Sequence, residues 1–215
     1  MAALAVVLGL VLLTITRAGY VYWIHRKSVR RVARPSSTST CAVSVFLGSG
    51  GHTTEALQLV AGLDGSRYNI RAFIFSAGDS LSVQRASSLS GSATQLIEIP
   101  RARRVHQPLS TVPRTFFLSL FGTIRLVVPR AGQTPLGDIL LMNGPGTCVV
   151  LCACVWIARF VGWPTPRMVY VESFARVTSL SLSGKILSPF VDRFIVQWPQ
   201  LASRSRFAEH RGWLI

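Results

Sequence analysis

The sequence predicts an α/β fold: a Rossmann-like, doubly wound domain with a parallel sheet, preceded by a single transmembrane helix. Two observations predict it. After residue 40, apolar runs of strand length alternate with longer helical stretches, which is the pattern of right-handed βαβ units. Before it, the stretch from Ala2 to Ile24 is almost wholly apolar and long enough to cross a bilayer. The 215 residues, 49% of them hydrophobic, can bury one substantial core beside this anchor.

We therefore divide the chain into four parts. They are a transmembrane anchor (1–24), a basic juxtamembrane segment and linker (25–40), a Rossmann-like domain (41–198) and a C-terminal tail (199–215).

The positive charges follow the anchor instead of preceding it. Five cations stand within nine residues: Arg26, Lys27, Arg30, Arg31 and Arg34. By the positive-inside rule they keep the following domain in the cytosol. A cleaved signal peptide has its charges before the apolar core and small residues at its end, the reverse of this order. Arg17 interrupts the anchor, and it either snorkels to the interface or shortens the span to the first sixteen residues.

The charge of the chain indicates an anionic partner. The net charge is +15 and the isoelectric point about 11.4, so the chain repels itself unless anions bind it. Nucleic acid is disfavoured, because the mean hydropathy is +0.42 and no basic helix alternates with base-stacking aromatic residues. Membrane lipid and phosphorylated substrates remain.

Six short apolar runs are the expected strands. They are Ala42–Leu47, Asn69–Phe75, Gln95–Ile99, Ile139–Met142, Met168–Val171 and Arg193–Val196. Helices are expected between them, at Thr53–Leu63, Asp79–Ser88, Val112–Val128, Thr147–Val161 and within Phe174–Leu187. The third helix has a wide apolar stripe flanked by Arg114, Arg125 and Arg130, so it either lies on a membrane surface or packs on the sheet.

The four cysteines do not predict a disulfide framework. Cys148, Cys152 and Cys154 fall in the apolar fourth helix, and Cys41 stands alone. We interpret them as reduced thiols of a cytosolic domain. Cys148 and Cys152 share a helix face, but nothing nearby completes four ligands, so no metal is expected.

A glycine turn follows the first strand. Gly48, Ser49, Gly50 and Gly51 lead into a helix at His52, with Thr53 or Thr54 available as the N-cap. Such a turn points backbone N–H groups and a positive helix end at one spot, which suits a phosphate or diphosphate. The dinucleotide fingerprint would require glycine in place of Thr53, and a P-loop would require Gly-Lys-Ser/Thr. A tight turn without a ligand is the structural alternative.

A second glycine turn and a basic cluster belong to the same edge of the predicted sheet. The second turn follows the fourth strand and comprises Asn143, Gly144, Pro145, Gly146 and Thr147. The basic cluster, at residues 101–106, follows the third strand. Ligands bind at the carboxyl edge of an open parallel sheet, beside the point where strand order reverses. The cluster is therefore expected to contact diphosphate oxygens or membrane headgroups, or simply to be solvated.

Several segments together resemble a known family, and the match covers nearly the whole chain. They are the anchor, Gly48–Thr53, Asn143–Thr147, Val171–Val177 and Phe190–Trp198. They closely resemble the membrane-anchored subunit of the UDP-N-acetylglucosamine transferase of asparagine-linked glycosylation. More remotely, the chain is similar to the N-terminal domain of the bacterial transferase that builds the lipid-linked peptidoglycan precursor. The resemblance implies the N-terminal half of a GT-B fold, which takes the lipid acceptor while a C-terminal domain takes the nucleotide sugar.

The resemblance also implies a function. The chain is expected to help add the second N-acetylglucosamine from UDP-N-acetylglucosamine to N-acetylglucosaminyl-diphosphodolichol, at the cytosolic face of the endoplasmic reticulum and of the nuclear envelope. Too few residues follow Trp198 for a donor-binding domain, so a separate soluble catalytic subunit is expected, without which the chain is inactive. No cofactor is expected, and no Asp-x-Asp motif requires a metal.

Transfer with inversion needs a base for the acceptor hydroxyl and groups that hold the diphosphate. His52 is either that base or a hydrogen-bond donor to a phosphate. Glu172, after the fifth strand, is the second candidate base or a partner of a sugar hydroxyl, and otherwise caps the chain or pairs with Arg176. The residues expected to bind the acceptor are Gly48, Ser49, Gly50, Gly51, Thr53, Arg101, Arg103, Arg104, Asn143, Gly144, Pro145, Gly146 and Thr147.

The apolar ending of the chain has two interpretations. Trp213, Leu214 and Ile215 are expected either to dock on the soluble subunit or to pack on their own domain. A pure membrane scaffold, in which the glycine turns bind nothing, is the alternative function. A nucleotide-sugar dehydrogenase is disfavoured by the missing fingerprint glycine.

Overall fold

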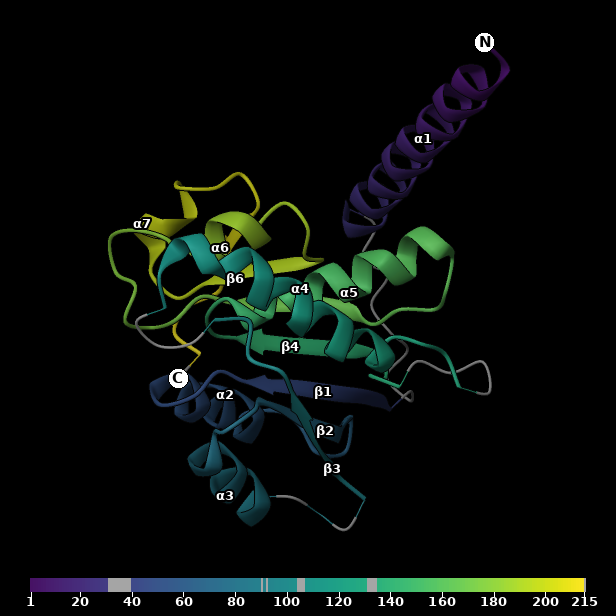
Figure 1. The fold of residues 1–215 in the computed structure, drawn as a ribbon. Helices are drawn as coiled ribbons and strands as arrows, with labels where there is room; N and C mark the ends of the chain where they lie inside the picture. The colour runs from purple at the N-terminus through teal and green to yellow at the C-terminus, as the bar shows by residue number, and fades with distance from the viewer. Residues whose placement is uncertain (31–39, 90, 92, 104–106, 131–134, 215) are drawn as a thin grey trace.

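The computed structural model describes residues 1–30, 40–89, 91, 93–103, 107–130 and 135–214 (Figure 1). Its centre is a parallel sheet of seven strands in the order β3-β2-β1-β4-β5-β6-β7. The strands are β1 (Cys41–Leu47), β2 (Tyr68–Ser76), β3 (Gln95–Ile99), β4 (Ile139–Asn143), β5 (Arg167–Val171), β6 (Arg193–Val196) and β7 (Ala208–His210). The helices are α1 (Ala2–Arg30), α2 (Gly51–Ala61), α3 (Ser80–Leu89), α4 (Val112–Thr123), α5 (Thr147–Val161), α6 (Leu182–Leu187) and α7 (Pro199–Ala202). The predicted Rossmann-like α/β fold is confirmed.

Helices cover both faces of the sheet. In Figure 1, α2 and α3 lie on one face, and α4, α5 and α6 lie on the other. The central strands are therefore apolar on both sides: in β1, Val45 packs toward α2 and α3, whereas Phe46 packs toward α5. Strand order reverses between β1 and β4, because β2 and β3 build outward from one side of β1 and β4 to β7 from the other. The carboxyl ends of β1 and β4 thus form the switch point of a doubly wound sheet.

The structure differs most from the expected elements at α2, α4 and the tail. Helix α2 begins at Gly51 with Gly50 as its N-cap, so neither Thr53 nor Thr54 has the capping position. Gly50 has a φ of 61° and a ψ of −127°, a backbone conformation that glycine adopts readily. The third predicted helix ends earlier, at Thr123, and continues as a single 3-10 turn, Ile124–Leu126. The tail contributes α7 and the strand β7, which pairs with β6 at the sheet edge.

The cysteines of α5 are buried, as the sequence indicated. Cys148, Cys152 and Cys154 pack in the core between α5 and the sheet. Burial raises the pKa of Cys152 and of Cys154 to about 12, so both remain thiols near neutral pH.

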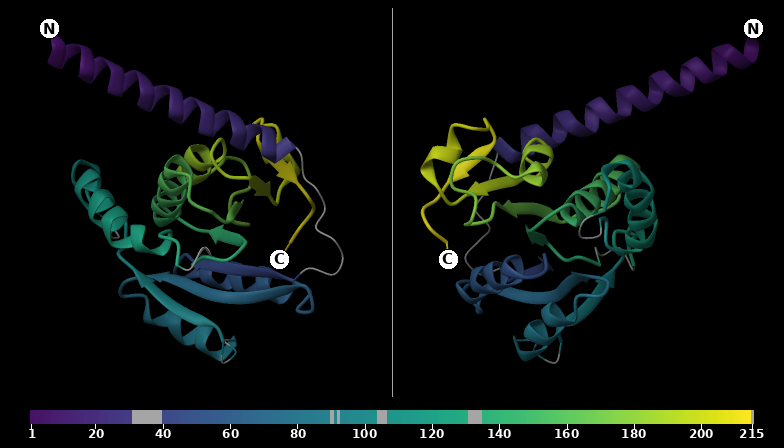
Figure 2. Two further views of the ribbon diagram at one scale, coloured as in Figure 1. Left: turned by 90° about the vertical axis from the view of Figure 1, so that its right-hand side faces the viewer. Right: turned by 60° about the vertical axis from the view of Figure 1, so that its left-hand side comes forward.

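Helix α1 is long and apolar enough to cross a bilayer. Its second half packs on α5. Figure 2 shows its first turns projecting away from the sheet. Arg17 donates from Nε to the carbonyl oxygen of Phe160 at 3.0 Å, at the end of α5. Residues 2–16 remain free and span only about 22 Å at 1.5 Å per residue. A bilayer core is about 30 Å thick, so these free turns alone are shorter than a full span.

A buried polar cluster fixes α1 to α5 and β6. Arg159 donates from Nη1 to Nδ1 of His25 at 2.7 Å and from Nη2 to Oδ2 of Asp192 at 2.7 Å. The backbone N–H of Met168 donates to the same carboxylate at 2.8 Å. Burial alone would raise the pKa of Asp192, but His25 and the Arg159 guanidinium beside it bring that pKa down to about 2. The ionised carboxylate therefore stabilises the docked anchor.

This cluster predicts a pH dependence of stability. The pKa of Asp192 falls from 3.8 to about 2 on folding, which corresponds to stability on the order of 2 kcal/mol above pH 4. Because the folded-state pKa is the lower one, this contribution is lost as the pH falls from about 4 to about 2. We expect Asp192→Asn to lower the free energy of unfolding at pH 5 and to differ little from wild type at pH 2. Denaturation of the full chain in detergent at both pH values measures this, and an equal difference at both would contradict it.

Candidate functional site

The two glycine turns meet at the switch point of the sheet. Leu47 at the end of β1 lies opposite Asn143 at the end of β4, so the turns that follow them are neighbours. A Cβ atom on Gly48 would lie 2.6 Å from the carbonyl oxygen of Asn143 and 2.9 Å from the Cα of Gly144. Gly144 has a φ of +151°, and a Cβ there would lie 3.0 Å from the Cα of Gly48. Both positions require glycine because the two backbones touch.

The rest of the first turn faces open space. Ser49 and Gly50 have positive φ angles of 41° and 61°, which turn the chain sharply into α2. A Cβ on Gly50 or Gly51 would meet nothing within 4 Å. No side chain caps the first backbone N–H groups of α2, so these donors and the positive end of the helix remain for an anion.

His52 stands beside this turn and is held by Asn143. Nδ1 of His52 lies 2.8 Å from Oδ1 of Asn143, and Nδ2 of Asn143 donates to Oε2 of Glu55 at 2.8 Å. The other oxygen of Glu55 accepts from the hydroxyl of Ser173, also at 2.8 Å. Four side chains from α2, the end of β4 and the end of β5 thus form one chain of hydrogen bonds. Asn143 is fully buried, whereas 35% of the His52 side chain is exposed.

Glu55 was not among the residues predicted from the sequence, although a signal for it was present. His52 and Glu55 are three residues apart on a helix, a spacing that places both side chains on one face. A carboxylate one turn after the glycine turn would have been the natural partner for the histidine.

Glu172 is buried, with its carboxylate engaged by the loop that follows it. It is 1% exposed. Oε2 accepts from the backbone N–H and the hydroxyl of Ser181, at 3.1 and 3.0 Å, and Oε1 accepts from the N–H of Ser173 at 3.2 Å. A Cβ on Gly184 would overlap with the same carboxylate, so α6 packs directly against it. This environment favours the capping role over the role of a base.

Two of the threonines predicted to bind the acceptor are buried beneath the glycine turns, and their hydroxyl groups form hydrogen bonds inside the domain. Thr53 is 1% exposed, and its hydroxyl lies 2.5 Å from that of Ser82 in α3. The hydroxyl of Thr147 is buried and accepts from Ser76 and from the N–H of Ala102, both at 3.4 Å. Both residues lie in the first turns of α2 and α5, so their backbone N–H groups belong to the helix starts, whereas their buried side chains point into the domain. In the second turn, Pro145 is exposed and a Cβ on Gly146 would meet nothing within 4 Å.

The basic cluster lies partly at this edge. Arg101 lines an open cleft of about 500 Å³ beside α4, at the carboxyl ends of β2 and β3. The other residues of the cleft wall are Ala77, Gly78, Pro100, Thr115, Leu118 and Ser119. Arg103 is exposed and donates to the carbonyl oxygen of Gln107 at 3.1 Å. Arg104 lies outside the described residues.

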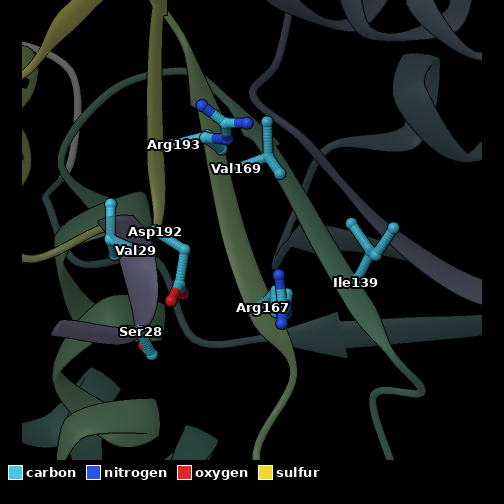
Figure 3. Close-up of a pocket in the computed structure, with 7 residues that line it drawn as sticks. All are labelled: Ser28, Val29, Ile139, Arg167, Val169, Asp192 and Arg193. Carbon is cyan, nitrogen blue, oxygen red and sulfur yellow. The ribbon is translucent and has the colours of Figure 1, made fainter. Parts of the chain in front are cut away.

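A second, smaller pocket lies at the opposite edge of the sheet and belongs to the anchor junction. Its volume is about 80 Å³. Figure 3 shows it between the end of α1 and the first residues of β4, β5 and β6. Its wall includes Asp192 and two arginines, Arg167 and Arg193. Arg193 is already paired, because Nη1 contacts both carboxylate oxygens of Glu209 at 2.6 and 2.7 Å.

The C-terminal tail folds back on the edge near Glu172. The ring of Trp213 packs edge-on against Trp198 at 5.8 Å and against Phe174 at 6.4 Å. The N–H of Leu214 donates to Oε1 of the buried Gln197 at 3.4 Å. Trp213 nevertheless stays 68% exposed, so one side of the ring packs on its own domain and the other faces outward. Ile215 lies outside the described residues.

Comparison with known proteins identifies the family. Residues 43–214 match the family model described as "Oligosaccharide biosynthesis protein Alg14 like". The chain is 49% identical over 172 residues to the UDP-N-acetylglucosamine transferase subunit alg14 of Schizosaccharomyces pombe, a match that covers 78% of this chain and 80% of the relative. A Cryptococcus neoformans relative of the same name is 43% identical over 201 residues, covering 88% and 86%. The Mus musculus relative is 37% identical over 220 residues, covering 96% and 94%. The chain therefore belongs to the Alg14-like family of oligosaccharide biosynthesis proteins.

Proposed function

We propose that this chain is the acceptor-binding subunit of an inverting N-acetylglucosaminyltransferase. Its substrates are UDP-N-acetylglucosamine and N-acetylglucosaminyl-diphosphodolichol, and its product carries the second N-acetylglucosamine of protein N-glycosylation. The observation that carries the proposal is the contact between Gly48 and Gly144, which joins two glycine turns beside the partly exposed His52. The relatives, named as UDP-N-acetylglucosamine transferase subunits, support it.

The acceptor diphosphate fits the open side of the first turn. The uncapped N–H groups at the start of α2 suit phosphate oxygens. Helix α5 begins directly after the second glycine turn, which contacts the first turn. Arg101 adds a positive charge at the same edge of the sheet, beside an apolar cleft wall formed in part by Leu118. This arrangement suits a diphosphate attached to an apolar chain.

The sugar donor arrives on another chain. Within the described residues there is one parallel sheet, and the proposed acceptor site occupies its switch point. We propose that a soluble catalytic subunit binds UDP-N-acetylglucosamine and docks through the tail at Trp213, Leu214 and Ile215. The outward face of Trp213 is expected to be the main contact of this docking surface, since large aromatic side chains contribute much of the binding energy of interfaces. We expect no turnover by this chain alone.

The anchor and α4 together hold the site at a bilayer, which we place at the cytosolic face of the endoplasmic reticulum. Both helices pack on α5, and Figure 2 shows them on the same side of the domain. The apolar stripe of α4 is split: Phe116, Leu120 and Ile124 pack on the core, whereas Phe117, Leu118 and Phe121 are exposed. Three exposed arginines flank the helix, Arg114, Arg125 and Arg130. Apolar rings with a basic rim suit an anionic lipid surface.

Removal of two rings tests the membrane contact of α4. Phe117 and Phe121 are 56% and 74% exposed, so changing both to serine should leave the stability of the domain nearly unchanged. Each ring that inserts contributes about 2 kcal/mol. In anionic lipid vesicles, we expect backbone hydrogen exchange of α4 to be much faster in this double variant than in the wild type. In detergent, we expect the two proteins to exchange at similar rates. The matched control changes Leu81 and Leu89, which are similarly exposed on α3 on the other face of the sheet. Equal behaviour of the two double variants would contradict the contact.

His52→Ala tests the chemistry of the site. In the reconstituted complex with the soluble subunit, we expect kcat to fall about 100-fold or more while binding of the lipid-linked acceptor changes little. Turnover and acceptor binding are measured separately, because a role at the diphosphate would weaken binding as well. Full turnover would remove His52 from the mechanism.

A further inference from the structure

We propose that Glu55 is a positioning residue that sets the tautomer of His52 through the side-chain amide of Asn143. The consequence is that Nδ1 of His52 carries the proton and Nε2 is a free acceptor on the open side of the glycine turns. This inference rests on the proposed function, since the group that would lose its proton to Nε2 is the acceptor sugar hydroxyl.

First, the carboxylate of Glu55 determines which of its neighbours donate hydrogen bonds. An ionised carboxylate only accepts hydrogen bonds, so both of its partners must donate. One partner is the hydroxyl of Ser173, at 2.8 Å from Oε1. The other is the side chain of Asn143, at 2.8 Å from Oε2, which must therefore turn its NH₂ group toward Glu55. Only 14% of the Glu55 side chain is exposed, so the pairing is largely shielded from water.

The second step follows from the fixed amide. With its NH₂ group directed at Glu55, Asn143 directs its carbonyl oxygen at Nδ1 of His52, 2.8 Å away. A carbonyl oxygen only accepts, so Nδ1 must carry a proton. Asn143 is 0% exposed, and turning its amide over would face its carbonyl oxygen toward the Glu55 carboxylate, which places two acceptors against each other inside the protein.

The third step concerns the other nitrogen. A neutral imidazole with a proton on Nδ1 has a lone pair on Nε2 and cannot donate from it. Nε2 has no hydrogen-bond partner in the described part of the chain, and 35% of the His52 side chain is exposed. The two roles considered for His52 are thereby separated: the neutral side chain is suited to take a proton and unsuited to donate to a phosphate.

The proton balance is simple. The acceptor hydroxyl gives its proton to Nε2 as its oxygen forms the bond to the anomeric carbon of the donor sugar. The bond from that carbon to the diphosphate breaks, and UDP leaves with the electron pair. His52 is then an imidazolium, and Oε2 of Glu55, 4.0 Å from Nδ1, stabilises its charge. Transfer of the proton to solvent restores the neutral form.

The tautomer itself is measurable without any activity. In the full chain labelled with ¹⁵N-histidine and reconstituted in nanodiscs, nitrogen chemical shifts distinguish a bare imidazole nitrogen from a protonated one. The chain has four histidines, and the signal of His52 is identified by its loss in His52→Gln. We expect a bare Nε2 in the wild type and a mixture of tautomers in Glu55→Ala. A protonated Nε2 in the wild type would overturn the inference, while leaving a phosphate-binding His52 and the proposed function intact.

Kinetics of the two-subunit complex give the second test. Glu55→Ala should lower kcat about 10- to 100-fold with little change in the KM of the lipid-linked acceptor, as expected when a partner that orients a histidine is lost. Glu55→Gln should recover most of this loss, because its carbonyl oxygen can still accept from Asn143. The control Gln58→Ala changes an exposed residue one turn further along α2 and should have no effect.

A double-mutant cycle separates positioning from folding. If Glu55 acts through His52, Glu55→Ala should cost nothing further in the His52→Gln background. Additive losses would overturn the inference and indicate a separate structural role for Glu55. Wild-type turnover by His52→Gln itself would instead refute the mechanism in the proposed function, without changing the tautomer result.

Discussion

Gly48→Ala is expected to disrupt the contact between the two glycine turns and to abolish transfer. The new Cβ would lie 2.6 Å from the carbonyl oxygen of Asn143 and 2.9 Å from the Cα of Gly144. Both atoms are backbone atoms at the ends of paired strands, so neither can move without breaking the pairing of β1 with β4. Overpacking of this kind costs about 3 kcal/mol. Denaturation of the full chain and a transfer assay with the soluble subunit measure the two effects.

The matched control for Gly48 lies in the same turn. A Cβ on Gly51 would meet nothing within 4 Å, and the residue stands at the start of α2 in helical conformation. Gly51→Ala should therefore leave the free energy of unfolding within about 0.5 kcal/mol of wild type. Equal stability of the two variants would show that the turns do not require their close approach.

Glu172→Ala has the second largest expected effect, on stability. Removal of this buried carboxylate leaves the N–H groups of Ser173 and Ser181 without their acceptor and opens a cavity against α6. Unsatisfied buried donors cost about 1 to 3 kcal/mol each, so we expect a loss of about 3 kcal/mol in the free energy of unfolding. Chemical denaturation in detergent measures it.

Glu172→Gln distinguishes the capping role from the role of a base. Glutamine keeps an acceptor for Ser181 but cannot take a proton, and its NH₂ group faces the N–H of Ser173 unfavourably. A capping residue should therefore retain most of its transfer activity at a cost of about 1 kcal/mol in stability. A loss of activity of about 100-fold with a stable fold would instead make Glu172 the base.

The sheet was predictable because its central strands, such as β1 and β4, are apolar and largely buried. Each of the six expected strands was placed within one residue of its bounds. The seventh, β7, is three residues long and contains Glu209, so it has no apolar pattern. It forms at an edge, where Glu209 pairs with Arg193 of β6. Such a strand depends on its neighbour and not on its own sequence.

The candidate site was predictable in its backbone but not in its side chains. The turns at Gly48 and Gly144 were expected to meet because parallel strands end at one edge. The spacing of His52 and Glu55 on one helix was visible in the sequence, but their links to Asn143 and Ser173 depend on side chains from other elements, which no sequence spacing reveals. The burial of Glu172 depends on a loop that folds over it from residues 173–181. Its position after a strand therefore indicated the ligand edge but not its surroundings.

The packing of α1 on the domain also could not be predicted from the sequence. His25, Arg159 and Asp192 are far apart in the chain and come together only when α1 packs on α5. The sequence suggested that the helix ends at residue 24 and that a basic juxtamembrane segment follows, yet His25 is buried within a helix that continues to Arg30. The hydrophobic pattern of a long helix whose second half packs on a domain does not differ from the pattern of a simple membrane-spanning helix.

The central claim, that this chain binds the lipid-linked acceptor, is tested most directly by a binding measurement on the chain alone. The full chain in nanodiscs, without the soluble subunit, is titrated with N-acetylglucosaminyl-diphosphate carried on a short isoprenoid. We predict saturable binding that inorganic diphosphate weakens by competition and that Gly50→Val, which places a side chain over the open face of the first turn, abolishes. Absence of binding by the wild-type chain would contradict the account and leave a membrane scaffold for the catalytic subunit.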